Sequence, residues 1–307
     1  MSKDSGLSLT EKDKNFFFHP FTALKSHEST GGRIIVEGKG STLTDSEGNK
    51  LLDAMAGLWC VNLGYGNTEL AETIHDQVKK LSYYHSFSGM STDLAAQLSE
   101  QIINMCPVPM SKVFFGNSGS DANDTHAKII WFYNNALGRP QKKKIISRLR
   151  GYHGVTVLSA GLTGLTNLHE GFDLPLDMIR HVRPPHRLWE KAAGATDAEF
   201  SQTLADELEA MIIKEGPDTV AAFIAEPVQA AGGVIVPPSE YFPAIQKVLK
   251  KYDVLLIADE VVTAFGLKFN LNVLSNLSSF KYFKCSFAGI SHTANLFLLS
   301  FFVISVF

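Results

Sequence analysis

Two acidic side chains directly follow continuous apolar runs in this sequence, at positions where an acid can do chemistry. Glu226 follows residues 221–225, and Asp259 follows residues 254–258. An acid after a buried strand lies near low dielectric, where its charge is costly without a cationic partner. The same position also suits a helix N-cap, which Asp often provides. Position alone therefore leaves a site role and a capping role open.

A glycine-rich loop at residues 116–120, Gly-Asn-Ser-Gly-Ser, opens a helical pattern directly after a short apolar run. Free N–H groups and the helix dipole make such a place suitable for phosphate, and a plain tight turn is about as common. The loop lacks the Gly-Lys-Ser/Thr of a nucleotide P-loop and the dinucleotide glycine spacing. It is also close to a serine-hydrolase elbow built on Ser118, but Ser120 replaces the required fifth-position Gly.

An aromatic residue, Tyr152, comes shortly after the apolar pair at residues 145–146. It could stack on a flat cofactor, although a single Tyr is more often a core residue. Trp59 is either a pocket wall or a packing residue. The combination of phosphate loop, stacking aromatic and strand-end acid is more specific, because a pyridine cofactor with a phosphate arm requires all three. The acid would pair with the protonated ring nitrogen and preserve the ring as an electron sink.

The elements that must position these residues alternate between strand and helix patterns. Apolar runs predict strands at residues 112–115, 144–147, 220–225 and 254–258, and the last two suit parallel strands buried on both faces. Apolar residues at helical spacing predict helices at residues 68–81, 92–105, 121–133, 203–213 and 239–251. Earlier in the chain, short strands are expected at residues 33–36 and 41–44, with a turn at 45–49. Repetition of strand, helix and strand predicts an α/β fold with a mostly parallel sheet.

Charge and cysteine usage exclude several classes of partner. The 307 residues contain 28 Lys and Arg against 31 Asp and Glu, a net charge of -3 that gives no case for nucleic-acid binding. Cys60, Cys106 and Cys285 form no metal-binding or disulfide spacing, which fits a reduced, cytoplasmic compartment. Residues 1–15 lack the pattern of a secretory signal or a transit peptide.

The composition changes at Leu267. The last 41 residues contain three lysines, no Asp, Glu or Pro, and eight of the 21 phenylalanines. The apolar segment at 296–307 is too short to span a bilayer, which takes about 20 residues, so no membrane partner is expected. We predict that residues 267–307 form an aberrant tail with no fixed partner in the body.

Several motifs, in the right order between about Phe16 and Gly266, resemble those of the class III (omega) aminotransferases, which are fold-type-I pyridoxal-phosphate enzymes. The motifs are residues 56–62, 83–87, 118–123, 152–154, 226–227 and 259–261. One departure within them is Asp121, where Glu is usual. The resemblance implies part of a small lobe at residues 1–60, an incomplete cofactor-binding large domain at 61–266, and the tail at 267–307 outside the family pattern.

The resemblance also implies a reaction and a set of cofactor contacts. The reaction is transamination from an omega-amino acid or amine, such as 4-aminobutyrate or β-alanine, to pyruvate or a similar keto acid. Gly119 and Ser120 would hold the phosphate of pyridoxal 5'-phosphate. Tyr152 would stack on its ring, Val261 would pack beneath the ring, and Asp259 would pair with the pyridinium nitrogen.

Substrate contacts are implied by the same resemblance. Glu226 would line the cofactor site, and Trp59, Phe87 and Tyr152 would shape the substrate pocket. In this family the residue at the position of Phe87 faces the site of the partner subunit, so the resemblance implies a homodimer.

The Schiff-base lysine of the family has no clear counterpart. Its expected place falls near Ala288, and the surroundings of Lys281 and Lys284 do not match the family motif. The alternative to a transaminase is therefore a catalytically dead, truncated chain that binds the cofactor weakly or pairs with a full-length subunit. A serine hydrolase built on Ser118 is a third interpretation.

Overall fold

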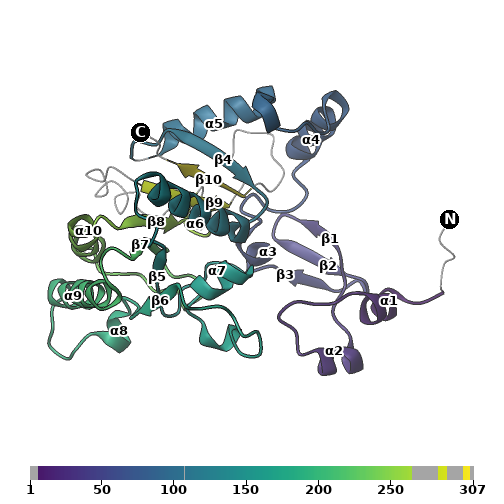
Figure 1. The fold of residues 1–307 in the computed structure, drawn as a ribbon. Helices are drawn as coiled ribbons and strands as arrows, with labels where there is room; N and C mark the ends of the chain where they lie inside the picture. The colour runs from purple at the N-terminus through teal and green to yellow at the C-terminus, as the bar shows by residue number, and fades with distance from the viewer. Residues whose placement is uncertain (1–5, 107, 265–282, 289–299, 305–307) are drawn as a thin grey trace. The chain divides into compact units, whose positions relative to one another are not determined.

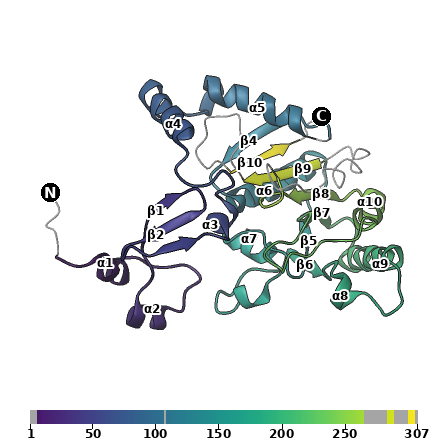
Figure 2. The ribbon, with the colours of Figure 1, turned by 180° about the vertical axis from the view of Figure 1, so that it is seen from behind.

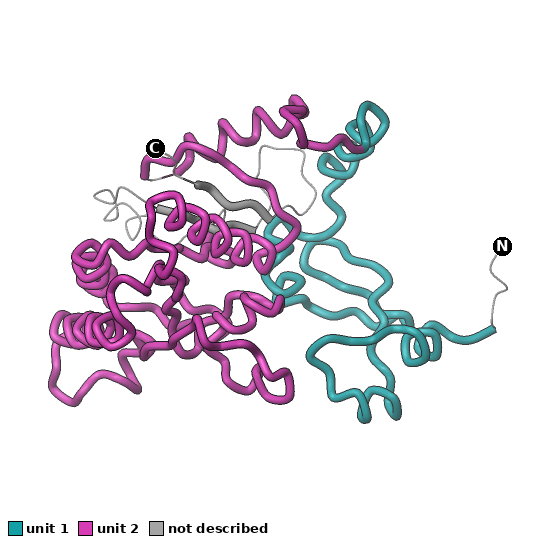
Figure 3. Tube along the Cα trace, in the orientation of Figure 1, with its two compact units in different colours: residues 1–82 teal, residues 83–307 magenta. Residues whose placement is uncertain are grey.

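The computed structural model describes residues 6–106, 108–264, 283–288 and 300–304. The chain divides into two compact units, residues 1–82 and residues 83–307 (Figure 3). This division falls later than the boundary predicted after residue 60, because helix α4 (Thr68–Lys80) groups with the first unit.

The first unit contains a small antiparallel sheet in the order β1-β2-β3. Its described elements are α1 (Leu9–Phe16), α2 (Leu24–Thr30), β1 (Ile35–Lys39), β2 (Thr42–Asp45), β3 (Lys50–Leu52), α3 (Ala56–Trp59) and α4. The predicted turn at residues 45–49 is confirmed, since the Asp45 carboxylate accepts hydrogen bonds from the N–H groups of Glu47 and Asn49. The first strand begins at Ile35 and runs further than predicted.

The second unit is built on one seven-stranded sheet, in the order β4-β10-β9-β8-β7-β5-β6 (Figure 1). Its strands are β4 (Lys112–Gly116), β5 (Lys144–Arg148), β6 (Ile179–Val182), β7 (Val220–Ala225), β8 (Leu255–Asp259), β9 (Phe283–Ala288) and β10 (Ser300–Ile304). Its α-helices are α5 (Asp93–Met105), α6 (Gly119–Ala136), α7 (Val157–Leu162), α8 (Arg187–Glu190), α9 (Asp197–Glu215) and α10 (Tyr241–Lys251). The predicted α/β fold with a mostly parallel sheet is confirmed. The strand β6 and the helices α7 and α8 were not predicted.

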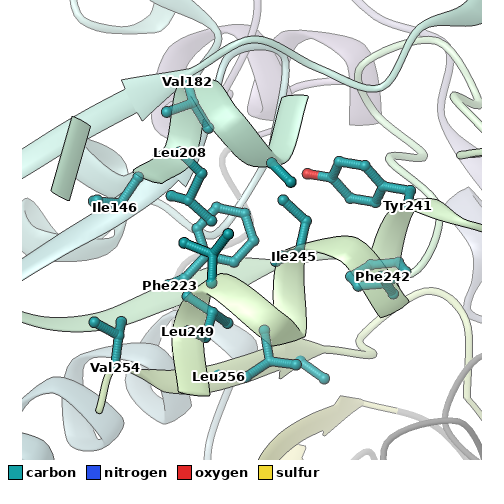
Figure 4. Close-up of a cluster of buried hydrophobic side chains, with 14 of the residues drawn as sticks. Ile146, Val182, Leu208, Phe223, Tyr241, Phe242, Ile245, Leu249, Val254 and Leu256 are labelled. Carbon is teal, nitrogen blue, oxygen red and sulfur yellow. The ribbon is translucent and has the colours of Figure 1, made fainter. Parts of the chain in front are cut away.

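Hydrophobic cores cover both faces of this sheet. One core combines side chains of α5, α9 and α10 with one face of the strands. Figure 4 shows part of it, with Leu208 of α9 and Leu249 of α10 against Phe223 of β7. The other combines α6 and α7 with the opposite face (Figure 2). In β8, Leu256 and Ala258 belong to the first core, whereas Leu255 and Ile257 belong to the second. This alternation explains the continuous apolar run, because each successive side chain enters a different core.

Part of the predicted tail belongs to the sheet. Strand β9 pairs in parallel with β8, and β10 pairs antiparallel with both β9 and β4. The expectation that residues 267–307 have no fixed partner is therefore wrong for these two strands. They carry aromatic and β-branched residues suited to a sheet, and they occupy the place between β8 and β4. No helix among the described residues has the length and apolarity needed to cross a membrane.

Candidate functional site

The carboxyl ends of four strands lie at one edge of the large sheet. Strands β5, β7 and β8 are parallel neighbours, and β4 has the same direction because β10 runs opposite to both β4 and β9. The chain after these ends contains the loop at 117–120, Tyr152 and Glu226, and β8 ends on Asp259. Open α/β sheets bind their ligands at this edge.

Asp259 is a buried carboxylate that accepts three hydrogen bonds. Its Oδ2 atom lies 2.8 Å from His153 Nδ1 and accepts a hydrogen bond of 3.0 Å from Asn123 Nδ2. Its Oδ1 atom accepts the N–H of Val261 at 3.2 Å. Asn123 also donates to the carbonyl oxygen of His153 at 2.8 Å, so these residues form one network.

The network determines the charge of Asp259. Burial opposes ionisation of this carboxyl, but the hydrogen bond and charge of His153, with the bonds from Asn123 and the Val261 N–H, outweigh it and lower the pKa below its ordinary value. Asp259 is therefore a buried anion at neutral pH. Asp259 Oδ1 accepts the backbone N–H two residues later, but no helix begins there among the described residues, so the N-cap role is not observed and the site role stays a prediction.

Glu226 follows β7 and binds backbone on both of its oxygens. Oε1 accepts the N–H of Tyr152 at 3.1 Å, and Oε2 accepts the N–H of Ala230 at 3.2 Å. Burial raises the pKa of Glu226 to about 7, although the positive charges of His153 and Arg148 oppose this shift. Glu226 therefore fixes the backbone at Tyr152 and titrates near neutrality.

Tyr152 lies close to the strand-end acids. Its side chain is half-buried. Burial and the negative charge of Asp259 raise the pKa of its phenol. The backbone N–H of Tyr152 donates to Glu226 Oε1 at 3.1 Å, and the next residue, His153, contacts Asp259. The structure therefore brings together Tyr152, Glu226 and Asp259, as the sequence predicted.

The glycine-rich loop ends at the first turn of α6. Ser118 is the N-cap, and its Oγ accepts the N–H of Asp121 at 3.1 Å. The first hydrogen bond of the helix type runs from the Ala122 N–H to the Ser118 carbonyl. The N–H groups of Gly119 and Ser120 lie before it and have no acceptor within the helix, as at any helix N-terminus. The capping role of Ser118 does not favour a nucleophile at this position.

Two glycines keep this loop close to the strand ends. A Cβ atom on Gly119 would lie 2.9 Å from Val261 Cγ2. A Cβ atom on Gly154 would collide with the hydroxyls of Ser120 and Ser159. The Ser120 hydroxyl also accepts the N–H of Val155 at 3.0 Å. Close approach at these positions joins the helix N-terminus, the segment after Tyr152 and Val261 into one cradle.

Trp59 belongs to the first unit and sits on a strained turn. Residues 56–59 all have positive φ, between 47° and 66°. Left-handed backbone costs roughly 1–2 kcal/mol for each non-glycine residue. Asp53 compensates by accepting hydrogen bonds of 2.7 Å from the Gly57 N–H and the Tyr65 hydroxyl. Such strain is often found at functional segments, and it presents the Trp59 ring with 43% exposure.

Phe87 lies in a short 3-10 turn at Phe87–Gly89, and its side chain is 78% exposed. The centres of the Phe87 and His85 rings lie 6.2 Å apart, and the backbone N–H of Phe87 donates to His85 Nδ1 at 3.2 Å. These contacts do not connect Phe87 to the acid network, so its predicted pocket role stays a prediction, as does that of Trp59.

Three residues of the network were not assigned a role from the sequence. Asn123 and His153 hold Asp259, and Arg148 donates to the Glu226 carbonyl at 2.5 Å. Asn123 and His153 lie inside motifs already recognised, three places after Ser120 and one place after Tyr152. Among the described residues, Asn123 Oδ1 and His153 Nε2 are buried without a hydrogen-bond partner. Buried polar atoms without a protein partner commonly bind an ordered water or an ion.

The positions considered for the Schiff-base lysine lie in or near strand β9. Lys281 lies outside the described residues, and Lys284 lies in β9 in register with Ile257. Ser286 is in register with Asp259, so β9 ends beside the acid network. Ala288, near which the Schiff-base lysine was expected, is the last residue of that strand.

Comparisons with known proteins agree with this geometry. A family model described as aminotransferase class-III matches residues 24–268. Diaminobutyrate–2-oxoglutarate transaminase of Halomonas elongata is 52% identical and covers 84% of this chain and 56% of its own length. A rice protein (Oryza sativa subsp. indica) named probable gamma-aminobutyrate transaminase 2, mitochondrial, is 52% identical, and the match covers 80% of this chain and 50% of that protein. The omega transaminase of Pseudomonas jessenii in complex with PMP superposes with a TM-score of 0.91 at 44% identity, over 98% of this chain and 66% of that one. The chain thus spans about half the length of the curated relatives.

Proposed function

Because this chain belongs to the class-III aminotransferase family, whose cofactor is pyridoxal phosphate, we propose that its strand-end site binds that cofactor for transamination. The proposed donor is an omega-amino acid or amine, such as 4-aminobutyrate or β-alanine, and the proposed acceptor is pyruvate or a similar keto acid. The observation that carries the proposal is Asp259, a buried carboxylate held ionised by His153 and Asn123.

The residues of the site fit the two ends of this cofactor. The N–H groups of Gly119 and Ser120 at the start of α6 suit a phosphate, and the contact of Gly119 with Val261 leaves no room for a side chain there. The Asp259 carboxylate suits a protonated pyridine nitrogen. Tyr152 would cover one face of the ring and Val261 the other.

Bound at this site, pyridoxal phosphate would supply an electron sink for removal of a proton beside the substrate nitrogen. Asp259 would keep the ring nitrogen protonated through its charge. His153 and Asn123 would orient the carboxylate, because each donates to its Oδ2 atom. Glu226 would fix Tyr152 through the backbone N–H and line the cofactor site.

The substrates are proposed from the resemblance and from the names of relatives. One relative is named for diaminobutyrate and 2-oxoglutarate, and another for gamma-aminobutyrate. These names support an amino-acid donor and a keto-acid acceptor. Pyruvate is the acceptor that we propose, and 2-oxoglutarate is the alternative that the assay must include. Trp59, Phe87 and Tyr152 are the proposed pocket residues.

A homodimer is proposed as the working assembly. Large apolar side chains cluster at residues 83–90, where Tyr83 and Phe87 are 77% and 78% exposed. Exposed apolar patches of this kind mark surfaces that a partner covers. Sedimentation of the full chain with and without Phe87→Ser tests this, since the substitution should shift the population toward monomer.

The cytoplasm is the proposed compartment. Cys60 and Cys106 are free thiols in the described part of the chain, which suits a reducing environment. Fractionation of cells expressing the tagged chain provides the test.

The experiment that tests the function uses the full chain and two readouts. Titration with pyridoxal phosphate should give saturable binding, and Asp259→Asn should weaken it at least about tenfold, because one partner of a buried charged network is lost. Asp206→Asn, a substitution on an exposed part of α9, is the matched control. Alanine formation from pyruvate and 4-aminobutyrate then measures turnover.

The outcomes separate the interpretations. Binding with alanine formation supports the transaminase. Binding without alanine or glutamate formation, when 2-oxoglutarate replaces pyruvate as well, supports the inactive cofactor-binding chain that the lysine position favours. Absence of binding overturns the proposal, and labelling of Ser118 by a fluorophosphonate would support the hydrolase instead.

A further inference from the structure

Outside the strand-end site, three metal-ligating side chains of the first unit meet at one point. Asp13 lies on α1, His27 lies on α2, and His19 lies in the connection between them. Asp13 Oδ2 lies 3.0 Å from His19 Nε2 and 3.0 Å from His27 Nε2. One ligand atom from each residue lies within 4.8 Å of both others. We propose that these residues form a binding site for a divalent transition-metal ion of the zinc class.

The geometry suits a tetrahedral ion. Zinc binds imidazole nitrogen and carboxylate oxygen at about 2.0–2.2 Å, which separates neighbouring ligand atoms by roughly 3.3 Å. The two N–O separations of 3.0 Å are close to this value, so small side-chain movements admit the ion. Two imidazoles and one carboxylate are a donor set that zinc and similar borderline ions prefer over Mg²⁺ or Ca²⁺.

The surroundings hold the ligands in place. The His19 and His27 rings lie 4.3 Å apart, and Phe17 packs edge-on against His19 at 4.4 Å. The His27 and Asp13 side chains are only 9% and 14% exposed. Lys14 on α1 donates from its ammonium to the Ser29 carbonyl at 3.4 Å, which adds a contact between the two helices. The His19 side chain is more open, at 24% exposure, but its ring is held between Phe17 and His27.

Space beside the ligand atoms comes from Gly32. A Cβ atom on this residue would lie 3.3 Å from His27 Nε2 and 3.6 Å from Asp13 Oδ2. Glycine therefore leaves room next to both atoms for the ion or for a water as the fourth ligand. Without an ion, both Nε2 atoms lie at hydrogen-bond distance from Asp13 Oδ2, and a bound ion would take the place of these two contacts.

The proposed site has a structural role, because its ligands join α1, the following connection and α2. An ion bound there ties residues 13–27 into one loop. The rate of trypsin cleavage measures this, since Lys14 and Lys25 are cleavage sites within that loop. Zn²⁺ should slow cleavage at both lysines.

The decisive test is titration of the full chain, free of pyridoxal phosphate, with Zn²⁺ against a chromophoric chelator. One equivalent should bind tightly, and His27→Gln and Asp13→Asn should each weaken it by at least about 100-fold. His75→Gln, an exposed histidine on α4, is the matched control and should bind as the parent does. Gly32→Ala keeps all three ligands and should weaken binding by crowding them, which tests the site where a ligand variant fails to fold.

Spectra with Co²⁺ identify the donors. Visible bands of a four-coordinate nitrogen and oxygen site support the proposal. Thiolate charge-transfer bands in the near ultraviolet would place the ion on a cysteine and overturn it. Zn²⁺ affinity that is absent in the parent, or equal in the parent, His27→Gln and Gly32→Ala, overturns it as well.

Discussion

His153 Nδ1 lies 2.8 Å from Asp259 Oδ2, with both side chains buried, so a histidine after β5 sets the charge of an acid at the end of β8. Asn123 on α6 completes the arrangement from a third element. The carboxylate is therefore fixed in orientation by groups that belong to α6 and to the segment after β5.

Removing His153 should make cofactor binding depend on pH. In the parent chain the pKa of Asp259 is lowered, so the carboxylate stays ionised through the neutral range and contributes equally across it. In His153→Ala burial dominates, the pKa of Asp259 rises, and the carboxyl gains a proton as pH falls. Pyridoxal-phosphate affinity should then decrease toward acid pH.

The measurement is the dissociation constant of pyridoxal phosphate across the neutral range, with His75→Ala as the control. Loss of affinity by about tenfold or more at the acid end is expected, which corresponds to a pKa displacement of about one unit. A profile of His153→Ala that superposes on that of the parent would show that His153 does not tune Asp259.

Much of this site could be predicted because its acids come after strands that are apolar throughout. Glu226 and Asp259 lie at the same edge since β7 and β8 are parallel neighbours. The partners of Asp259 could not be predicted, because Asn123 sits on a helix and pairing across 136 residues has no local signal.

The pairing of β9 and β10 with the sheet could not be predicted either, because it also depends on residues far apart in the sequence. The composition of the tail differs from that of the body, and composition says nothing about which strand edges remain to be paired. β8 and β4 lie far apart in sequence, and β9 and β10 fill the place between them. In the first unit, the backbone conformation around Trp59 could not be predicted. Residues 56–59 have four successive positive φ angles, and the residue types there do not indicate them.

Glu260 should make stability depend on pH. Burial raises the pKa of this acid to about 7 from 4.5, and Thr263 donates to its carboxylate without reversing the shift. The folded state therefore binds a proton that the unfolded state has released, so this contribution is full below 4.5 and is lost as pH rises to about 7. Over that range the loss is about 3 kcal/mol.

Glu260→Gln keeps the acceptor for Thr263 and removes the titration. Its free energy of unfolding should exceed that of the parent above pH 7 and should match it at acid pH, as measured by urea denaturation. Glu240→Gln, an exposed control before α10, should leave the profile of the parent unchanged. A stability difference that is constant with pH would contradict the assignment.

Strand β9 should be necessary for the stability of the second unit. Ser286 pairs with Asp259 of β8 on one side and with Phe302 of β10 on the other. Proline there removes a ladder donor inside a central strand, where it is essentially not tolerated. Ser286→Pro should lower the free energy of unfolding by about 3 kcal/mol or more.

Ser286→Ala is the control, because it changes the side chain and keeps the backbone donor. Thermal unfolding of both variants provides the measurement. Equal melting of Ser286→Pro and the parent would mean that residues 283–288 are dispensable for the sheet.

The contact between Gly119 and Val261 should show as energetic coupling. A Cβ atom on Gly119 would lie 2.9 Å from Val261 Cγ2, closer than carbon atoms pack. Alanine is otherwise the better residue in a helix, by about 1 kcal/mol over glycine. Any destabilisation by Gly119→Ala must therefore come from its neighbour, and Val261→Ala should relieve it.

A double-mutant cycle measures this coupling by unfolding and by pyridoxal-phosphate affinity. Gly119→Ala should lose stability and affinity, and the double variant Gly119→Ala, Val261→Ala should recover part of both, with a coupling energy of about 0.5–3 kcal/mol. Val261→Ala alone reports the packing that this side chain contributes. Additive effects of the two substitutions would show that Gly119 and Val261 are not energetically coupled. That result would contradict the proposal that the loop and the strand end form one cradle for the phosphate and the ring.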